Sequence, residues 1–363
     1  MSRHAGGVAG DEVGTSDPRT APPAPADPAA HPSSGELTIV AADSRETGLL
    51  PSNPISGLIQ VSARRRLGMS DISAMPLALD ARSFGYTVNH EDAFALLDYF
   101  AACGGTLIHT ADHYAGGMSE WTVGRWLASR AVRNQMVVMT KVGRHPDAFG
   151  LSGSALTAAV DASLSRLGID RIDVLSFDGE DPKAPLAESL GAVDRLMAAG
   201  KVRTIGAAGF GVERVFEARV LAANGLPRIE TWQTPYSLMN RKEFEGAPEV
   251  VARAQGIAVL PTMRADVVLG VKPRRRLEVR AIVKSLKRSV AAPRAKKVEE
   301  VLDTLSRQLG ESPATIALAW LLAQPTVAAP IVEAATPAEL ERHLRAISLQ
   351  LGRTELIELG RAA

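Results

Sequence analysis

Histidine and aspartate side chains gather in one short region of this chain. His109, Asp112 and His113 lie close together, and His145 and Asp178 follow after the next two predicted strands. Imidazole titrates near neutral pH, and imidazole with carboxylate can also ligate a divalent metal. A His-x-x-x-His pair is typical of a metal site mainly when a helix aligns both histidines on one face. This pair straddles a strand end and a loop, so we expect the mouth of a polar pocket without a metal.

The elements that must position these residues follow a regular alternation. From about Met75 onward, short apolar runs alternate with longer amphipathic stretches, as in repeated βα units around a parallel sheet. Eight strands are predicted, at Leu77–Ala81, Thr106–His109, Met136–Thr140, Asp173–Phe177, Arg203–Ala207, Glu230–Gln233, Ile257–Pro261 and Val327–Ile331. Eight such units close into an α/β fold, the (β/α)8 TIM barrel.

Helices are predicted between these strands, and capping residues precede two of them. Asn89 stands before the first helix, and Ser312-Pro313 supplies a cap and a first-turn proline to the last. The predicted helices are Glu91–Ala102, Ser119–Ala128, Ser154–Leu167, Leu186–Ala199, Val212–Ala223, Pro248–Gln255 and Ala314–Ala323. Active sites of such barrels lie at the carboxyl ends of the strands, where the histidine and aspartate cluster falls.

Composition places the chain among soluble globular proteins. Of its 363 residues, 46% are hydrophobic and 22% charged, and the net charge of +1 indicates no particular partner. No run approaches the roughly 18 to 20 apolar residues that span a bilayer, and no secretory signal is visible. The single cysteine, Cys103, can form no internal disulfide, and an inert buried thiol is compatible with the cytoplasm.

The domain organisation is predicted from composition. A Gly-, Ala- and Pro-rich tract predicts a disordered tail over residues 1–36. Residues 37–63 form an extension whose structure the sequence leaves open, with two short apolar pieces that suit a small β element. Residues 64–363 form the barrel.

A basic segment over residues 271–297 interrupts the barrel pattern between its last two predicted strands. It carries eleven Lys and Arg residues against one acid, Glu278. A solvated surface segment is the ordinary explanation of such a run. The alternatives are attraction of an anionic ligand or docking of an acidic carrier domain. No aromatic residue interleaves the charges, so nucleic-acid binding is not supported.

Several motifs in order resemble the aldo/keto reductase family. Residues 107–120 read LIHTADHYAGGMSE, which is similar to the signature of that family. Further similar segments are TKVG at 140–143, SRLGIDRID at 165–173, GKVRTIG at 200–206, and Gln233 followed by YSLMNR at 236–241. The resemblance covers roughly residues 64–360 and implies the same barrel.

The resemblance also implies a catalytic set with two substitutions. Members use a tyrosine as proton donor, a lysine and an aspartate that tune it, and a histidine that orients the carbonyl. Tyr114 and Lys141 match, whereas His109 stands at the aspartate position and Asp178 at the histidine position. We expect Asp178 to pair with Lys141, which leaves His109 free to titrate near neutral pH. Decay of an unused tetrad is the alternative to a working exchange.

The positions that hold the nicotinamide cofactor in the family have changed further. The Ser-Asn pair that holds the nicotinamide amide falls on Ala208 and Gly209, which offer no side-chain hydrogen bond. Glu333 stands near the position of the cofactor's phosphate, where a carboxylate repels it. Only Gln233 survives clearly. We therefore expect no cofactor or weak NADPH binding at most; the other changed positions are Thr262 and Ala335.

Three functions remain open at this point. The first is acid-base chemistry without hydride transfer, of lyase, isomerase, cyclase or dehydratase type, on a small carbonyl or sugar-like metabolite. The second is a divergent NAD(P)H-dependent reductase, and the third is an inactive barrel used for binding or regulation. We expect the substrate pocket to be lined by His113, His145, Phe177 and Trp232.

Overall fold

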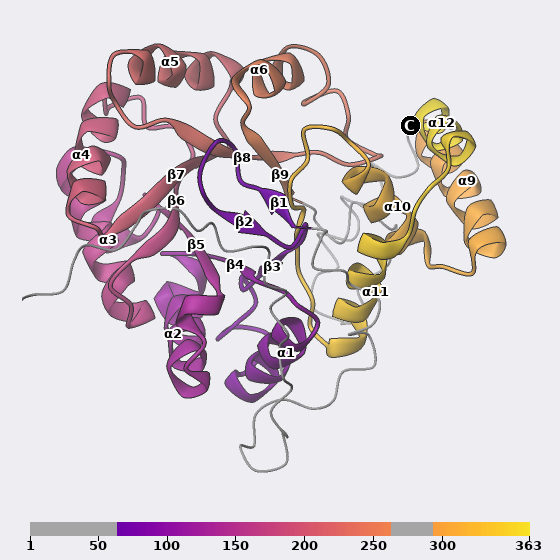
Figure 1. Ribbon diagram of the computed structural model, residues 1–363, viewed down its shortest axis with the longest axis horizontal. Helices are drawn as coiled ribbons and strands as arrows, with labels where there is room; N and C mark the ends of the chain where they lie inside the picture. The colour runs from indigo at the N-terminus through magenta and orange to yellow at the C-terminus, as the bar shows by residue number, and fades with distance from the viewer. Residues whose placement is uncertain (1–63, 263–292) are drawn as a thin grey trace, which may run out of the picture. The chain divides into compact units, whose positions relative to one another are not determined.

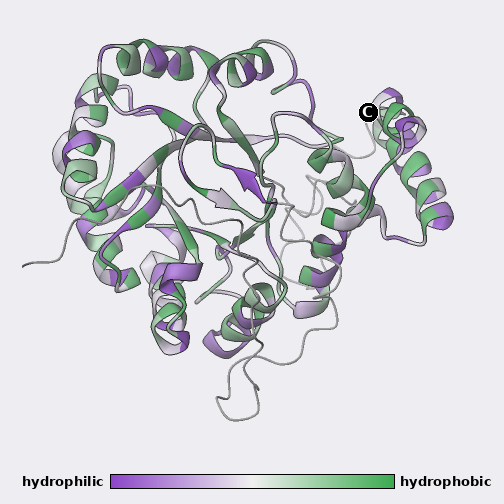
Figure 2. Cartoon of the chain, in the orientation of Figure 1, coloured by the Kyte–Doolittle hydropathy of each residue, from purple (hydrophilic) through white to green (hydrophobic). Residues whose placement is uncertain are grey.

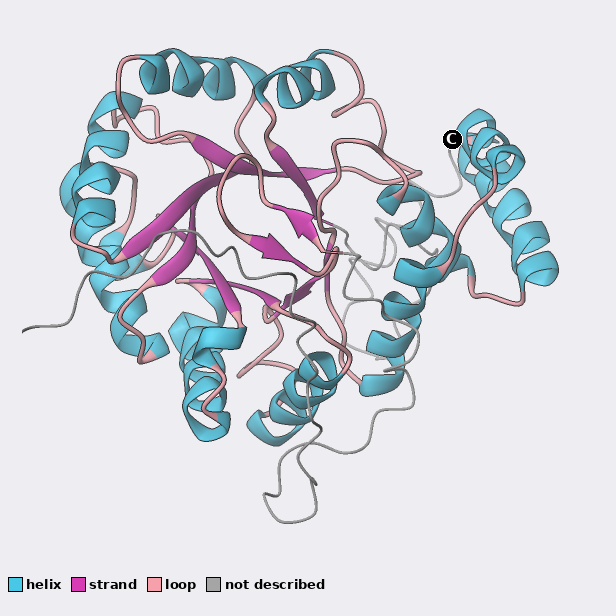
Figure 3. Cartoon of the chain, in the orientation of Figure 1, coloured by secondary structure: helices cyan, strands magenta, loops and turns pink. Residues whose placement is uncertain are grey.

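Eight parallel strands close into a barrel, as predicted. The computed structural model describes residues 64–262 and 293–363. Around the barrel the strands follow the order β10-β3-β4-β5-β6-β7-β8-β9, and helices surround them (Figures 1 and 3). The strands are β3 (Ala78–Asp80), β4 (Leu107–Ala111), β5 (Val137–Val142), β6 (Ile172–Asp178), β7 (Val202–Ala208), β8 (Ile229–Pro235), β9 (Ala258–Thr262) and β10 (Ile331–Val332).

The predicted helices form within a few residues of their expected bounds. Their caps are as expected, because the Asn89 and Ser312 side chains accept from the backbone N–H groups of Asp92 and Thr315. These helices are α1 (His90–Ala102), α2 (Met118–Arg130), α3 (Gly153–Leu167), α4 (Leu186–Ala198), α5 (Val212–Ala223), α6 (Ala247–Gln255) and α10 (Pro313–Leu322). Further helices are α9 (Pro293–Leu309), α11 (Pro337–Ser348) and α12 (Arg353–Ala362), with short 3-10 turns η2 (Tyr114–Gly117), η3 (Arg133–Gln135) and η4 (Pro146–Ala148).

Side chains along each strand point alternately into the barrel and outward to the layer of helices. Leu107, Met139 and Val174 pack together in the barrel interior. Their neighbours Ile108 and Leu175 belong to the larger core between strands and helices. The surrounding helices carry hydrophobic and hydrophilic residues on different faces (Figure 2). Every second residue of a strand therefore points inward, which decides which side chains reach the pocket.

A short hairpin covers the amino-terminal end of the barrel. Its strands are β1 (Arg65–Arg66) and β2 (Ser73–Ala74). Leu67 and Ile72, in the turn between them, are buried among interior residues at the starts of the barrel strands. This apolar packing fills one end of the barrel and leaves the carboxyl end for the polar residues.

Several expectations fall on residues outside the described part of the chain. These are the disordered tail over 1–36, the extension over 37–63 and most of the basic segment over 271–297. At the end of that segment, Lys296 and Lys297 are exposed on α9. Among the described helices, none has the length and apolar character needed to cross a membrane.

Candidate active site

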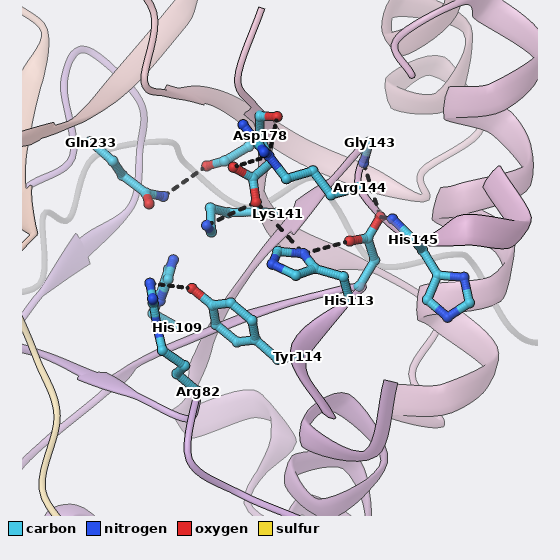
Figure 4. A network of polar contacts seen from close by, with 12 residues as sticks. Arg82, His109, His113, Tyr114, Lys141, Gly143, Arg144, His145, Asp178 and Gln233 are labelled. Atoms are coloured by element: carbon cyan, nitrogen blue, oxygen red, sulfur yellow. Dashed lines mark hydrogen bonds and ion pairs between the residues drawn. The ribbon is translucent and has the colours of Figure 1, made fainter. Parts of the chain in front are cut away.

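The polar residues predicted from the sequence converge at the carboxyl ends of the barrel strands. Inward-facing positions near these ends carry His109 on β4, Lys141 on β5, Asp178 on β6 and Gln233 on β8 (Figure 4). The register between adjacent parallel strands decides which residues lie side by side: Lys141 lies beside Ala111, and Asp178 lies beside Ala208. The strands thus bring together residues that lie up to 124 positions apart in the chain (233 minus 109).

His109 forms a buried pair with an aspartate from the neighbouring strand. Its Nδ1 lies 2.9 Å from Asp80 Oδ1, at the end of β3. Burial opposes ionisation of Asp80, but the imidazole of His109, with Arg82 and Lys141 nearby, keeps the pKa of that carboxyl below its ordinary value. A carboxylate at Nδ1 places the proton of a neutral imidazole there and leaves Nε2 as the basic nitrogen. This buried Nε2 has no hydrogen-bond partner among the described residues.

Asp80 belongs to this site but was not predicted from the sequence. The two substitutions predict one imidazole and one carboxylate on exchanged strands, whereas the structure adds a second carboxylate beside His109. The exchange therefore describes the pocket incompletely. A signal for Asp80 was present, because an acid at the carboxyl end of an otherwise apolar run, Leu77–Ala81, faces the pocket in a barrel of this kind.

Tyr114 lies in the turn η2, directly after β4, and its hydroxyl meets an arginine. Arg82 Nη2 donates to that hydroxyl over 2.8 Å. Burial, and next the negative charge of Asp80, raise the pKa of the Tyr114 phenol well above its ordinary value, although Arg82 acts in the opposite direction. Tyr114 is therefore protonated at neutral pH and can donate a proton or a hydrogen bond to a substrate.

Lys141 and Asp178 form the contact that we expected of them. Lys141 Nζ lies 2.9 Å from Asp178 Oδ2, and Arg144 Nε lies 3.1 Å from the other carboxylate oxygen. His113 Nδ1 stands 3.7 Å from the same Asp178. A lysine and an arginine thus balance this carboxylate, which holds Lys141 in place beside the ring of Tyr114.

The His113 side chain and the backbone of His145 contact a third carboxylate, Asp112. Asp112 is fully buried and accepts from the backbone N–H groups of Gly143 and His145, at 2.9 and 3.3 Å. His113 Nδ1 lies 3.2 Å from it. The His145 ring points away from this network and caps η4 (Figure 4). Within the described ranges, no three His, Cys, Asp or Glu side chains come together as a metal site.

Two aromatic residues expected in the pocket lie on its outer side. Phe177 and Trp232 are both buried in the core between strands and helices, where Phe177 stacks on Phe210 with ring centroids 6.0 Å apart. Their neighbours Asp178 and Gln233 face inward, and strand alternation then turns the preceding residue outward. The prediction of pocket-lining aromatics was wrong because it weighed residue type over this alternation.

Gln233 is the position at which the family resemblance implies a retained cofactor contact. Its Nε2 donates to Ser176 Oγ over 3.2 Å, and its buried Oε1 has no described partner. Beside it, Ala208 and Gly209 contribute no polar side chain. Glu333 Oε1 instead lies 3.2 Å from Arg82 Nε.

Comparisons with known proteins agree with these motifs. The family model described as "Aldo/keto reductase family" matches residues 78–360. The protein tas of Escherichia coli is 28% identical over 337 residues, covering 81% of this chain and 95% of that protein. The uncharacterized oxidoreductase YrpG of Bacillus subtilis is 28% identical over 301 residues, covering 78% and 91%.

A fungal enzyme gives a third match. The norsolorinic acid reductase stcV of Emericella nidulans is 28% identical over 312 residues, covering 80% of this chain and 79% of that protein. The family match extends through all eight barrel strands and includes every polar residue of the pocket described above. This chain belongs to the aldo/keto reductase family.

Proposed function

We propose that this protein catalyses proton transfer next to the carbonyl group of a small, sugar-like substrate, without hydride transfer. The observation that carries the proposal is the buried Asp80–His109 pair, whose Nδ1–Oδ1 distance is 2.9 Å. A carboxylate that fixes the tautomer and orientation of an imidazole is a recurring arrangement for a general base. His109 is the base in this mechanism, and Asp80 positions it.

The proton-transfer step uses groups on two sides of the pocket. His109 Nε2 takes the proton from the carbon beside the carbonyl, and the electron pair of that C–H bond forms a C=C bond. Tyr114 donates its proton to the carbonyl oxygen, so the substrate becomes an enol. In an isomerisation, the protonated His109 gives its proton to the former carbonyl carbon, and the Tyr114 phenolate takes a proton from the hydroxyl on the neighbouring carbon, which becomes the new carbonyl. In a dehydration, a hydroxide leaves the carbon next to the C=C bond and takes the His109 proton to form water, while the enol proton returns to Tyr114. Isomerase, lyase and dehydratase reactions share this first step.

The arrangement of charges supports proton transfer. Burial keeps Tyr114 in its protonated form, while Asp80 keeps its negative charge beside His109. Tyr114 can therefore donate a proton, and Asp80 orients the imidazole that we propose as the acceptor; an acid-base step requires both. Lys141 lies over the ring of Tyr114, and its ammonium group can stabilise negative charge that develops on the carbonyl oxygen.

NAD(P)H-dependent reduction of a small carbonyl is the second candidate. Its support is the retained Gln233, with a buried side-chain oxygen free to accept a hydrogen bond, and the names of relatives such as norsolorinic acid reductase. Tyr114 serves as proton donor in this candidate as well. Against this candidate, Ala208 and Gly209 stand where family members carry the Ser-Asn pair that holds the nicotinamide.

Solvent deuterium exchange tests the proposal without knowledge of the natural substrate. The protein is incubated in D2O with a panel of aldoses, ketoses and α-hydroxyketones, and proton NMR follows the loss of the signal beside each carbonyl. We expect exchange with at least one class of compound. His109→Gln should slow exchange by at least about 10²-fold, the usual scale of general base catalysis. Asp80→Asn should also slow exchange, because the imidazole loses its fixed tautomer.

Glu299→Gln, on the exposed face of α9, is the control and should exchange like the parent protein. The proposal is wrong if no compound exchanges while the same panel supports NADPH oxidation. It is also wrong if exchange persists unchanged in His109→Gln.

A further inference from the structure

Arg82 occupies a position at the pocket that the acid-base pair does not explain. It follows β3 by two residues and its side chain is half exposed. Its guanidinium donates from Nη2 to the Tyr114 hydroxyl over 2.8 Å and lies 4.9 Å from the centroid of that ring. Its Nε faces two carboxylates, at 3.5 Å from Asp80 and 3.2 Å from Glu333. Arg82 thus contacts the Tyr114 hydroxyl (Figure 4) and also lies within ion-pair distance of two acids.

Lys141, the cation that the family resemblance assigns to the tyrosine, is engaged elsewhere. Its Nζ donates to Asp178 over 2.9 Å. Relative to Tyr114 it lies over the ring, 5.2 Å from the centroid. The hydroxyl oxygen therefore has a described hydrogen bond from Arg82, whereas Lys141 meets the face of the same ring.

We propose that Arg82 has taken over from Lys141 the role of the cation that positions the Tyr114 hydroxyl and stabilises its phenolate after proton donation. The hydrogen bond from Nη2 leaves the phenol's own hydrogen free to point at a substrate oxygen. When that proton leaves, the O–H bond breaks, the new O–H bond forms on the substrate, and the negative charge remains beside the guanidinium. A charge-assisted hydrogen bond of this kind is stronger than a neutral one.

The surroundings of Tyr114 show why this contact matters. From β3 and β6, the carboxylates of Asp80 and Asp178 both disfavour the phenolate. From β4 and from the turn that follows it, the rings of His109 and His113 meet the tyrosine edge-on, with centroids 6.2 and 4.9 Å away.

Arg82 opposes the two carboxylates through both its charge and its hydrogen bond. Arginine keeps its charge well above neutral pH, whereas an imidazole in its place would lose its charge near neutral pH.

Glu333 modulates how strongly Arg82 stabilises the Tyr114 phenolate. It lies directly after β10, with its Oε1 3.2 Å from Arg82 Nε, and neutralises part of the arginine charge. Removal of the Glu333 charge should therefore strengthen the effect of Arg82 on Tyr114. This gives the inference a second variant with the opposite sign.

Titration of a fluorinated tyrosine at position 114 tests the inference directly. A trifluorotyrosine introduced there by stop-codon suppression titrates several pH units lower than tyrosine, and fluorine NMR follows its ionisation in the full-length protein without substrate. Arg82→Gln should raise the pKa of this phenol by about one unit, a tenfold change in its ionisation constant. Glu333→Gln should lower the pKa, and Arg82→Lys should restore part of the loss.

Arg144→Gln is the matched control. Arg144 is exposed to a similar extent at the same pocket but contacts Asp178 instead of the phenol, so its removal should move the pKa much less than removal of Arg82. A larger effect of Lys141→Gln than of Arg82→Gln overturns the inference, as does a Glu333→Gln variant with an unchanged or raised pKa.

The inference rests on the proposed function only for the use of Tyr114 as proton donor. The titration needs no turnover, so its outcome is separate from that of the deuterium-exchange experiment. Unchanged phenol titration in Arg82→Gln would reject Arg82 even if exchange occurs.

Discussion

A single inward-facing position on β4 carries an imidazole, and the carboxylate that orients it comes from the adjacent strand. His109 and Asp80 are register partners on β4 and β3. Because the two side chains leave neighbouring strands at the same height, their 2.9 Å contact needs no loop to hold it. A base fixed by two strands is well placed to meet a substrate without rearrangement.

Asp112 gives a prediction at the scale of one residue. Burial disfavours its charge, but the hydrogen bond from His113 and the backbone N–H groups of Gly143 and His145 outweigh burial and lower its pKa. A carboxyl with a lowered pKa stabilises the fold above its unfolded value of about 3.9, and this stability is lost as the pH falls through the folded pKa. Asp112→Asn should therefore lower the free energy of unfolding at pH 7 by about 1 to 3 kcal/mol.

The difference between parent and Asp112→Asn should shrink as the pH falls below about 4. Denaturant unfolding at several pH values measures it, with the exposed Asp147→Asn as a control that should change little. If the parent and Asp112→Asn differ in free energy of unfolding by the same amount at pH 7 and at pH 3, the loss of stability comes from the changed shape of the side chain and not from its charge.

Helix packing gives a prediction at the scale of elements. Gly124 in α2 lies against the end of α3, where a Cβ atom would fall 2.1 Å from the Leu167 carbonyl oxygen. Gly124→Ala should destabilise the protein by about 1 to 3 kcal/mol, because two helices must separate. Gly191→Ala in α4 is the matched control, since its Cβ would meet only an arginine tip at 3.9 Å.

Gly191→Ala should stabilise the protein by up to about 1 kcal/mol, because alanine is the better helix former. Thermal unfolding of both variants measures the contrast. Equal melting temperatures for Gly124→Ala and Gly191→Ala would show that the close contact between α2 and α3 is not constraining.

The sequence predicted elements better than it predicted the neighbours of single residues. Periodicity located all eight strands, although the last was expected at Val327–Ile331 and forms at Ile331–Val332. There, residues 327–330 are apolar but only Val327 makes a bridge, to Val259. Motif positions located Tyr114, Lys141 and Asp178, whose contacts follow from strand order.

The incorrect and missing predictions concern which face of a strand a residue occupies. Phe177 and Trp232 were expected in the pocket from their type, and alternation turns them into the outer core. Asp80 and Arg82 were missed because their contacts with His109 and Tyr114 join strand ends that are about 30 residues apart, at separations of 29 and 32. Side-chain pairing across strands is settled by register, which a single sequence does not state.

At the scale of the whole described barrel, the two ends have different roles. The amino-terminal end is filled by Leu67 and Ile72 of the β1–β2 hairpin, packed against interior residues. The carboxyl end holds the ionisable residues, as in other barrels of this architecture. Stability and chemistry are thereby separated along the barrel axis, so the pocket can change residues without loss of the fold.

Dinucleotide binding tests most directly whether this family member uses its pocket for acid-base chemistry without a nicotinamide cofactor. Isothermal titration calorimetry with NADPH and NADP⁺ is performed on the parent protein and on the double variant Ala208→Ser, Gly209→Asn, which returns polar side chains to the lost clasp. We expect no binding to the parent at millimolar dinucleotide and measurable binding to the double variant. Micromolar binding of NADPH to the parent protein would contradict the account and favour the reductase.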